Sequence, residues 1–426
     1  MLALLAALQM AGATQDSLPT VTLPEALRRA TGLDPNYVAA IGQVDNAVWA
    51  RRSAFAVFIV PAVSLTADAT RYSSPTFNIG TLTLQTNAVD ARVDARYDLF
   101  TGGQKVAELQ RSAAALDGAR AGALQARFAA ALLTESGYYA VLADAELLRV
   151  ARERLQRAEQ QLAVARARVA SGAAVQTDSL QLRLELSQAR VGLLRQQADW
   201  QVARLELGRR VGEDGPVNAA PLDSVLPPEL PLPLDAAVRE AAAQGPQYRQ
   251  VRANERAAAA AFRSRLGAYL PHASLAATSI AFDTKFFPKA TTRSSLTLTV
   301  TLPIWDNAQR EIALTQARAN RDVAQAIRRD MDRSVRRDVT AAYDGFTTAR
   351  ASADIAAEAV AVARENFRVQ RSRYQAGATT ILDLLEAQVS LGDAEAASVQ
   401  ARHATRLALA GLENILGRRL FAEKEQ

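Results

Sequence analysis

Residues 89–97 read V-D-A-R-V-D-A-R-Y, and this stretch decides the fold. Apolar residues occupy every second position, which is the period of a β-strand with two different faces. The other face carries a row of charged side chains, namely Asp90, Arg92, Asp94 and Arg96. Burying such a row of charges in a packed core would cost much free energy, whereas leaving it in contact with water costs little. The sequence therefore predicts a strand with one apolar face and one wet face.

Three further segments also alternate, although two of them do so less regularly. Together with residues 89–97 they make two pairs of segments that follow each other in the sequence. Residues 295–302 read S-L-T-L-T-V-T-L, residues 63–72 alternate more weakly, and residues 273–282 are the poorest of the four. Strands of about ten residues with one continuous apolar face fit a transmembrane β-barrel with a water-filled lumen. The alternative is an antiparallel sheet packed on helices with one face wet. Because even small membrane barrels use about eight strands, a membrane location requires several copies of the chain to share one barrel.

The two strand pairs belong to an internal repeat. Four pairs of matching residues are each separated by 205 positions: Tyr138 and Tyr343, Gly172 and Gly377, Asp178 and Asp383, and Gly212 and Gly417. Each repeat is expected to contain a helix, a strand pair, a very long helix, a turn and a last helix. The long helical segments contain no proline and few glycines, and each should extend roughly 100 Å. Helices of that length must turn their apolar positions toward neighbouring helices, as in a coiled coil or a tube.

The expected boundaries follow from these patterns. The first repeat is 14–212, with strand pair 62–98, long helix 104–170, tip turn 171–177 and helix 178–211. The second repeat is 234–417, with strand pair 273–303, long helix 309–376, tip turn 377–382 and helix 383–416. The shorter first helices are expected at 36–58 and 247–269, a Pro-rich linker at 213–233 and a C-terminal tail at 418–426.

The N-terminus resembles an export signal. Residues 2–10 contain one polar side chain, and Ala11-Gly12-Ala13 reads as a small-x-small cleavage site. We therefore expect residues 1–13 to be a signal peptide, although no Lys or Arg precedes the apolar stretch; a buried N-terminal helix is the alternative. No later segment reaches the roughly 18 to 20 apolar residues that a spanning helix needs.

Composition excludes several classes of protein. The chain of 426 residues is 49% hydrophobic and 22% charged, which excludes wholesale disorder. It has no cysteine, so disulfides, thiol catalysis and thiolate-bound metals are excluded. The net charge of +6 is dispersed and gives no support for nucleic-acid binding. Because phosphate-loop, zinc-protease and nucleophile-elbow motifs are missing, we predict no catalytic residue, no metal site, no cofactor and no enzyme activity.

The whole pattern resembles the TolC-type outer-membrane efflux proteins. The resemblance rests on the twofold repeat, on Pro61 and Pro271 before the strands, on YDLFTGGQ and LPIWDNAQ before the long helices, and on YQAGATTILDLLEAQ at 374–388. It implies a mainly α fold with a β-barrel part. Three chains would form a 12-strand barrel in the outer membrane of a Gram-negative-type cell, continuous with a tunnel of long helices in the periplasm. It also implies a passive exit duct for efflux or type I secretion, which docks a periplasmic adaptor and an inner-membrane pump.

The resemblance places a gate at the ends of the long helices. It implies a closing hydrogen bond between Asp178 and Tyr374, with Thr177 and Thr379 beside it. In the best-known member of the family a basic residue stands at the position of Thr379, so one closing contact is expected to be missing. The small and apolar turn residues are expected to dock the adaptor, although an ordinary hairpin needs the same types: Gly172, Ala173, Ala174, Val175, Gly377, Ala378, Thr379, Thr380 and Ile381.

Two acidic residues near the second turn suggest ion selectivity. Asp383 and Glu386 are three positions apart and therefore share one helix face. The resemblance turns this face toward the tunnel, where threefold symmetry would make two cation-attracting rings. The alternative is a pair of solvated surface acids. For the whole protein, the rival interpretation is a periplasmic adaptor or coiled-coil scaffold without a pore, because these proteins also use long hairpins.

Overall fold

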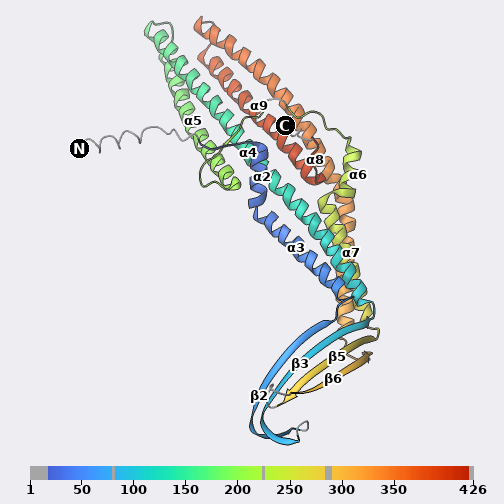
Figure 1. Ribbon diagram of the computed structural model, residues 1–426. Helices are drawn as coiled ribbons and strands as arrows, with labels where there is room; N and C mark the ends of the chain where they lie inside the picture. Colours follow the sequence, from blue (N-terminus) through green and yellow to red (C-terminus); the bar gives the residue numbers. More distant parts are fainter. Residues whose placement is uncertain (1–17, 79–81, 223–225, 284–289, 422–426) are drawn as a thin grey trace, which may run out of the picture. The chain divides into compact units, whose positions relative to one another are not determined.

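The computed structural model describes residues 18–78, 82–222, 226–283 and 290–421 (Figure 1). The predicted signal peptide, 1–13, lies outside the described residues, as do the last five residues of the predicted tail. The elements are β1 (Thr20–Val21), α2 (Leu23–Leu33), α3 (Pro35–Ala56), β2 (Ala62–Asn78), β3 (Thr83–Thr101), α4 (Gln104–Ala170), α5 (Gln176–Val211), β4 (Asn218–Ala219), α6 (Leu234–Gln244), α7 (Pro246–Gly267), β5 (His272–Asp283), β6 (Thr291–Thr301), α8 (Gln309–Gln375) and α9 (Ile381–Leu416).

The chain divides into two compact units, and each takes segments from both halves of the sequence. The first unit holds the chain up to Ala40, Leu124–Pro246 and the chain from Val335 onward. The second holds Ile41–Ala123 and Gln247–Ser334, and it contains the large sheet. Because α4 and α8 contribute to both units, each long helix carries residues of both.

The sheet of the second unit has four antiparallel strands in the order β2-β3-β5-β6. The central pairing joins the two halves of the sequence, with Val93 of β3 opposite Ser279 of β5. The strand pairs predicted by alternation are therefore neighbours in one sheet. In β6 the apolar positions stay open to solvent in the single chain, with Leu296 69% exposed and Val300 65% exposed. This sheet leaves β2 and β6 as its outer strands.

The two junctions between strand and long helix have the same backbone bend but different residues. Before α4, Gly102 and Gly103 have φ angles of +59° and +83°. Before α8, Asn307 and Ala308 have φ angles of +57° and +63°, a region that side-chain-bearing residues rarely adopt. A Cβ atom on Gly102 would lie 2.2 Å from the backbone oxygen of Gly267, so this junction has room only for glycine.

The long helices are uninterrupted over 67 residues each. The expected ranges were 104–170 and 309–376, and α8 ends one residue earlier, at Gln375. Absence of proline and abundance of alanine, arginine and glutamine account for their continuity. Within the described ranges, none of the helices is both long enough and apolar enough to cross a membrane.

The first unit is held by buried apolar clusters and by buried polar contacts. The fully buried Tyr138 of α4 donates its hydroxyl to the backbone oxygen of Ala220 at 2.7 Å, beside the parallel pair β1 and β4. Burial raises the pKa of this hydroxyl to about 12, so it remains a donor at ordinary pH. One tyrosine thereby fixes the segment after β4 against α4.

Charged side chains also lie inside the first unit, between α4, α5, α8 and α9. Glu185 is 6% exposed and accepts from Arg154 at 3.0 Å and from Gln388 at 2.9 Å. Glu395 is 7% exposed and pairs with Arg157 at 3.2 Å and with Arg364 at 3.4 Å. Paired in this way, the carboxylates connect helices from both halves of the sequence.

Several elements differ from the predicted boundaries. The last helices begin two residues earlier than expected, at Gln176 in α5 and at Ile381 in α9, so both tip turns are shorter. Strand β3 continues to Thr101, past the expected end at 98. The short elements β1, β4, α2 and α6 were not predicted. β1 and β4 have two residues each and carry too little pattern to be recognised, whereas α2 and α6 are amphipathic helices of 11 residues whose periodic signal was overlooked.

Candidate functional site

Two helical hairpins of the first unit, α4–α5 and α8–α9, end in turns of the same construction (Figure 1). Gly172 and Gly377 have φ angles of +74° and +78°, which explains the glycine at this point of each turn. In both turns the next residue's amide closes the bend: Ala173 donates to the Arg168 carbonyl and Ala378 to the Arg373 carbonyl, each at 2.8 Å. The helix ends are therefore matched in backbone as well as in sequence.

Most of the predicted docking residues lie on the surface of these turns. The exposed ones are Gly172, Ala173, Val175, Gly377, Ala378 and Thr380, whereas Ala174 and Thr379 are half-buried. Ile381 differs, because it is 6% exposed and belongs to an apolar cluster with Leu182, Phe367 and Leu384. Its side chain holds the hairpins together and is not presented to solvent.

The structure brings Asp178 and Tyr374 together across the two hairpins. The Tyr374 hydroxyl donates to the Asp178 carboxylate at 3.1 Å, and Tyr374 is only 3% exposed. Burial, assisted by the Asp178 charge, raises the pKa of Tyr374 to about 12. The contact between α5 and α8 is therefore a hydrogen bond from a neutral hydroxyl to a charged group. Thr177, beside Asp178, is exposed.

A basic residue that sequence reasoning missed lies beside this bond. Arg168, in the last turn of α4, donates to the Tyr374 carbonyl oxygen and, at 3.2 Å, to that of Ala173. Its guanidinium also stands 4.8 Å from the centre of the Tyr374 ring. The internal repeat could have revealed the role of Arg168. Arg373 occupies the matching position in the second repeat and donates to the carbonyl oxygen of Ala378 at 3.4 Å.

Asp383 caps the N-terminus of α9. Its Oδ2 accepts from the Thr379 hydroxyl at 2.6 Å, from the Thr380 hydroxyl at 2.7 Å and from the Thr380 amide at 3.0 Å. The Thr380 hydroxyl in turn accepts from the Asp383 amide at 3.3 Å, which completes a capping box. The bonds from Thr379 and Thr380 lower the pKa of Asp383 to about 2. Glu386 is exposed one turn later.

The polar face of β3 forms a second candidate region, in the second unit. Asp94 accepts from the Thr278 hydroxyl of β5 at 2.8 Å, and Arg92 lies 3.9 Å from the Asp90 carboxylate. Arg96 lies 3.5 Å from Asp98, and its side chain is 70% exposed. All four predicted lumen residues therefore belong to one strand face with partners along and across the sheet.

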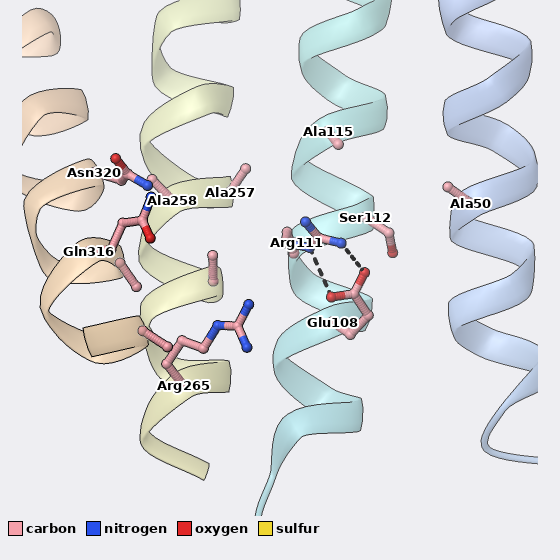
Figure 2. A pocket seen from close by; sticks show the side chains of 13 residues that line it. Ala50, Glu108, Arg111, Ser112, Ala115, Ala257, Ala258, Arg265, Gln316 and Asn320 are labelled. Atoms are coloured by element: carbon pink, nitrogen blue, oxygen red, sulfur yellow. Dashed lines mark hydrogen bonds and ion pairs between the residues drawn. The ribbon is translucent and has the colours of Figure 1, made fainter. Parts of the chain in front are cut away.

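A cavity of about 620 Å³ lies among α3, α4, α7 and α8 of the second unit (Figure 2). Alanines form much of its wall, and the Glu108–Arg111 ion pair, at 2.6 Å, stands on α4. Arg265 extends from α7 toward the side of α4, and Gln316 of α8 also lines the cavity. In the described part of the chain, no group of three or more acidic or histidine side chains is arranged to hold a metal ion.

Comparisons with known proteins agree with this architecture. The model of the family described as outer membrane efflux protein matches residues 27–213 and 237–418. Protein CyaE of Bordetella pertussis is 32% identical over 122 residues, which are 29% of this chain and 26% of CyaE. The matched part therefore spans about a quarter of that relative's length.

Solved structures with the same fold include three bacterial membrane proteins. A membrane protein from Pseudomonas aeruginosa matches with a TM-score of 0.78 and 21% identity, over 94% of this chain and 91% of the other. VceC of Vibrio cholerae gives 0.77 and 18%, over 94% and 97%. The CmeC outer membrane channel of Campylobacter jejuni gives 0.80 and 14%, over 93% and 85%. The similarity to these solved structures shows that the chain has the same fold. The match to the family model shows that the chain is related to the outer membrane efflux proteins. The chain is a member of the TolC-type outer membrane efflux protein family.

Proposed function

We propose that three copies of this chain form a passive exit duct in the outer membrane of a Gram-negative-type cell. Family membership supports an outer-membrane efflux duct. The observation that supports a shared barrel is the sheet order β2-β3-β5-β6, which leaves an outer strand on each side, and the number of three chains follows from the resemblance to TolC-type proteins. Unpaired strand edges are not tolerated in lipid, so each edge needs a neighbour. Three chains of four strands make a 12-strand barrel, within the range known for membrane barrels.

The faces of the sheet fit this proposal. Leu296, Leu298 and Val300 form an exposed apolar row on β6, suited to lipid. The charged row on β3, from Asp90 to Arg96, is suited to a wet lumen. In this arrangement the long helices form the periplasmic tunnel. We also propose that 14–212 and 234–417 are two structural repeats joined by the linker 213–233, because their junctions and turns match.

The tips supply the proposed gate and docking surface. The Asp178–Tyr374 bond is the proposed closing latch, supported by its position between two hairpins. Arg168, which contacts Tyr374, is the proposed substitute for the basic residue absent at Thr379. The exposed small residues of both turns are the proposed contacts for a periplasmic adaptor that also binds an inner-membrane pump. Ala173→Asp together with Ala378→Asp should abolish adaptor binding, and unchanged binding would place the docking surface elsewhere.

The acidic ring is proposed at Asp383 and Glu386 on α9. Both are exposed, and the charge of Asp383 persists at ordinary pH because its pKa is lowered to about 2 by its bonds to Thr379 and Thr380. Three copies around one axis would concentrate six carboxylates, which attract cations.

Extraction and conductance test the duct. The chain should partition with outer membranes, need detergent for release, migrate as a trimer and give ion-conducting steps in planar bilayers. Light scattering in detergent measures the protein mass of the complex. A monomer released without detergent would contradict the proposal and favour the adaptor or scaffold interpretation.

A further inference from the structure

We propose that a polar cavity between α4 and α8 binds a small oxyanion of the inorganic phosphate or sulfate class. The cavity lies in the first unit, has a volume of about 120 Å³, and reaches α9 at Leu384. Its lining includes Arg157 and Gln161 from α4, and Arg371 and Tyr374 from α8. At roughly 30 Å³ per water molecule, the volume suits about four waters or one small oxyanion.

Gln161 is the first reason to assign a ligand here. It is 6% exposed, and both its amide nitrogen and its amide oxygen are buried without a hydrogen-bond partner among the described residues. Buried side-chain amides are nearly always hydrogen-bonded, because an unpaired one loses the free energy of hydration without compensation. A polar side chain this deep in a coiled-coil interface therefore points to a partner inside the cavity that it lines.

Arg157 gives a second, independent unsatisfied donor. Its terminal nitrogens reach Glu395 at 3.2 Å and Glu153 at 3.8 Å, so both ends of the guanidinium fork are engaged. Its Nε atom is buried and has no partner among the described residues. Arg157 and Gln161 are one helical turn apart on α4, which places their two free donors on the same face.

The charge of the wall favours an anion over water. Arg157 is neutralised by Glu153 and Glu395, whereas the exposed Arg371 makes no ion pair with the residues that the structure describes. No carboxylate lines the cavity. The remaining polar lining consists of glutamines 160 and 375 and of Tyr374, whose hydroxyl is directed to Asp178. The lining therefore presents donors and one uncompensated positive charge, the pattern that binds oxyanions. The unpartnered Gln161 amide oxygen is an acceptor, and the hydroxyl of a protonated phosphate would satisfy it.

The position of the cavity connects the ligand to the helix tips. Arg371 precedes Tyr374 by three residues, so they share one face of α8. An oxyanion held by Arg371 and by donors of α4 would bridge α4 and α8 next to the α5–α8 bond of Asp178 and Tyr374. Bound anion thus stabilises the hairpin arrangement described above, and this consequence for the gate rests on the proposed function.

Titration calorimetry of the full chain in detergent tests the site with inorganic phosphate. The unaltered protein should bind phosphate saturably, and Arg371→Gln should weaken binding at least tenfold. Gln161→Leu, which removes both amide atoms at similar volume, should also weaken it at least tenfold. The matched control is Arg368→Gln, because Arg368 is one turn away on α8, pairs with exposed Glu365 at 2.6 Å and does not line the cavity. This control should change affinity less than twofold.

The outcomes separate the alternatives. Saturable binding that is lost in both lining variants and kept in the control supports the site. No saturable binding, or equal binding by all four proteins, overturns it and leaves a cavity filled by water only. Glycerol phosphate distinguishes sources, since a phosphate monoester is bulkier than inorganic phosphate and should compete poorly for a cavity of about 120 Å³. Equal competition would overturn the assignment to a free oxyanion. Because calorimetry does not require a pore, failure of the chain to conduct ions would contradict the duct without deciding the anion site.

Discussion

At the scale of single residues, the Tyr374 hydroxyl is the most specific part of the proposed gate. Tyr374→Phe removes the donor to Asp178 and keeps the buried ring. A hydrogen bond to a charged group is worth roughly 1.5–3 kcal/mol, so the closed state should lose stability by that order. Open probability in single-channel recordings should rise at least tenfold. The control is Tyr343→Phe, since the Tyr343 hydroxyl donates to the backbone of Leu232 at 3.4 Å, away from the tips; equal effects of both variants would contradict a latch at Tyr374.

The protonation of Tyr374 predicts how this latch depends on pH. Its pKa is raised by burial and by Asp178 to about 12, so the neutral hydroxyl that donates the bond is present at ordinary pH. The contribution of the bond is complete below the usual tyrosine pKa of about 10 and is lost as pH rises through the raised value.

Asp383 and Glu386 can be separated, because only Asp383 caps α9. Asp383→Asn should lower the thermal midpoint, whereas Glu386→Gln should leave it unchanged and reduce block by trivalent cations. In the folded chain the pKa of Asp383 is lowered to about 2 from the ordinary aspartate value. The stabilisation by its charge is therefore fully present when the pH is above the ordinary value, and it is lost as the pH falls toward 2. The midpoint difference between Asp383→Asn and the unaltered protein should therefore persist from pH 7 to pH 4 and shrink below pH 3. Unchanged cation block in Glu386→Gln would contradict the ring.

At the scale of elements, the segment after α9 is anchored by one arginine. Arg419 pairs with Glu135 of α4 at 2.5 Å and with Glu413 of α9 at 2.6 Å, and both carboxylates are at most 5% exposed. The backbone amide of Leu420 donates to Glu413 at 2.8 Å. This contact fixes the end of the last helix to the middle of a long helix.

Arg419→Ala removes one cation from two buried carboxylates, those of Glu135 and Glu413. Removing one partner of a fully buried ion pair costs about 3–5 kcal/mol, and because the Arg419 side chain is itself 40% exposed the cost here should be smaller. Thermal unfolding in detergent should therefore begin at a lower temperature. The matched control is Arg418→Ala, whose partner Glu240 and own side chain are 24% and 48% exposed. Surface pairs contribute at most about 1 kcal/mol, so this control should change little. Equal loss in both variants would mean that Arg419 acts only through surface charge.

The elements also show where sequence reasoning succeeds and fails. Long helices are readable because 67 residues without proline leave one regular conformation. Strand β3 is readable because its charges alternate with apolar residues. Arg168 was missed because its role depends on Tyr374, 206 positions away, which no local pattern reports. The start of α9 was misplaced because the capping box between Thr380 and Asp383 lets the helix begin at Ile381. The start of α5 was misplaced as well, and there Val175 precedes the helix without any side-chain cap.

At the scale of the whole molecule, the outer strands predict how chains meet. If three sheets close one barrel, β6 of one chain must pair with β2 of the next. The chain contains no cysteine, so introduced cysteines report this contact without background. Thr66→Cys in β2 combined with Thr297→Cys in β6, and neighbouring pairs shifted along β6 by two residues, should give disulfide-linked ladders up to trimer.

Single variants provide the control for this experiment, since one cysteine per chain cannot connect β2 to β6. They should remain monomeric on denaturing gels after oxidation. Absence of any linked species across the whole series of paired variants would mean that the outer strands do not meet, and the shared barrel would be wrong.

The backbone bend before α8 has a consequence for engineering this chain. The first half of the sequence makes this bend with Gly102 and Gly103. The second half makes it with Asn307 and Ala308, and Ala308 carries a methyl group although its φ is +63°. A left-handed conformation costs a side-chain-bearing residue roughly 1–2 kcal/mol relative to glycine. Ala308→Gly should therefore raise the melting temperature, and a lower one would contradict the cost assigned to the methyl group. Here the deletion of one carbon atom is expected to make a chain of 426 residues more resistant to heat.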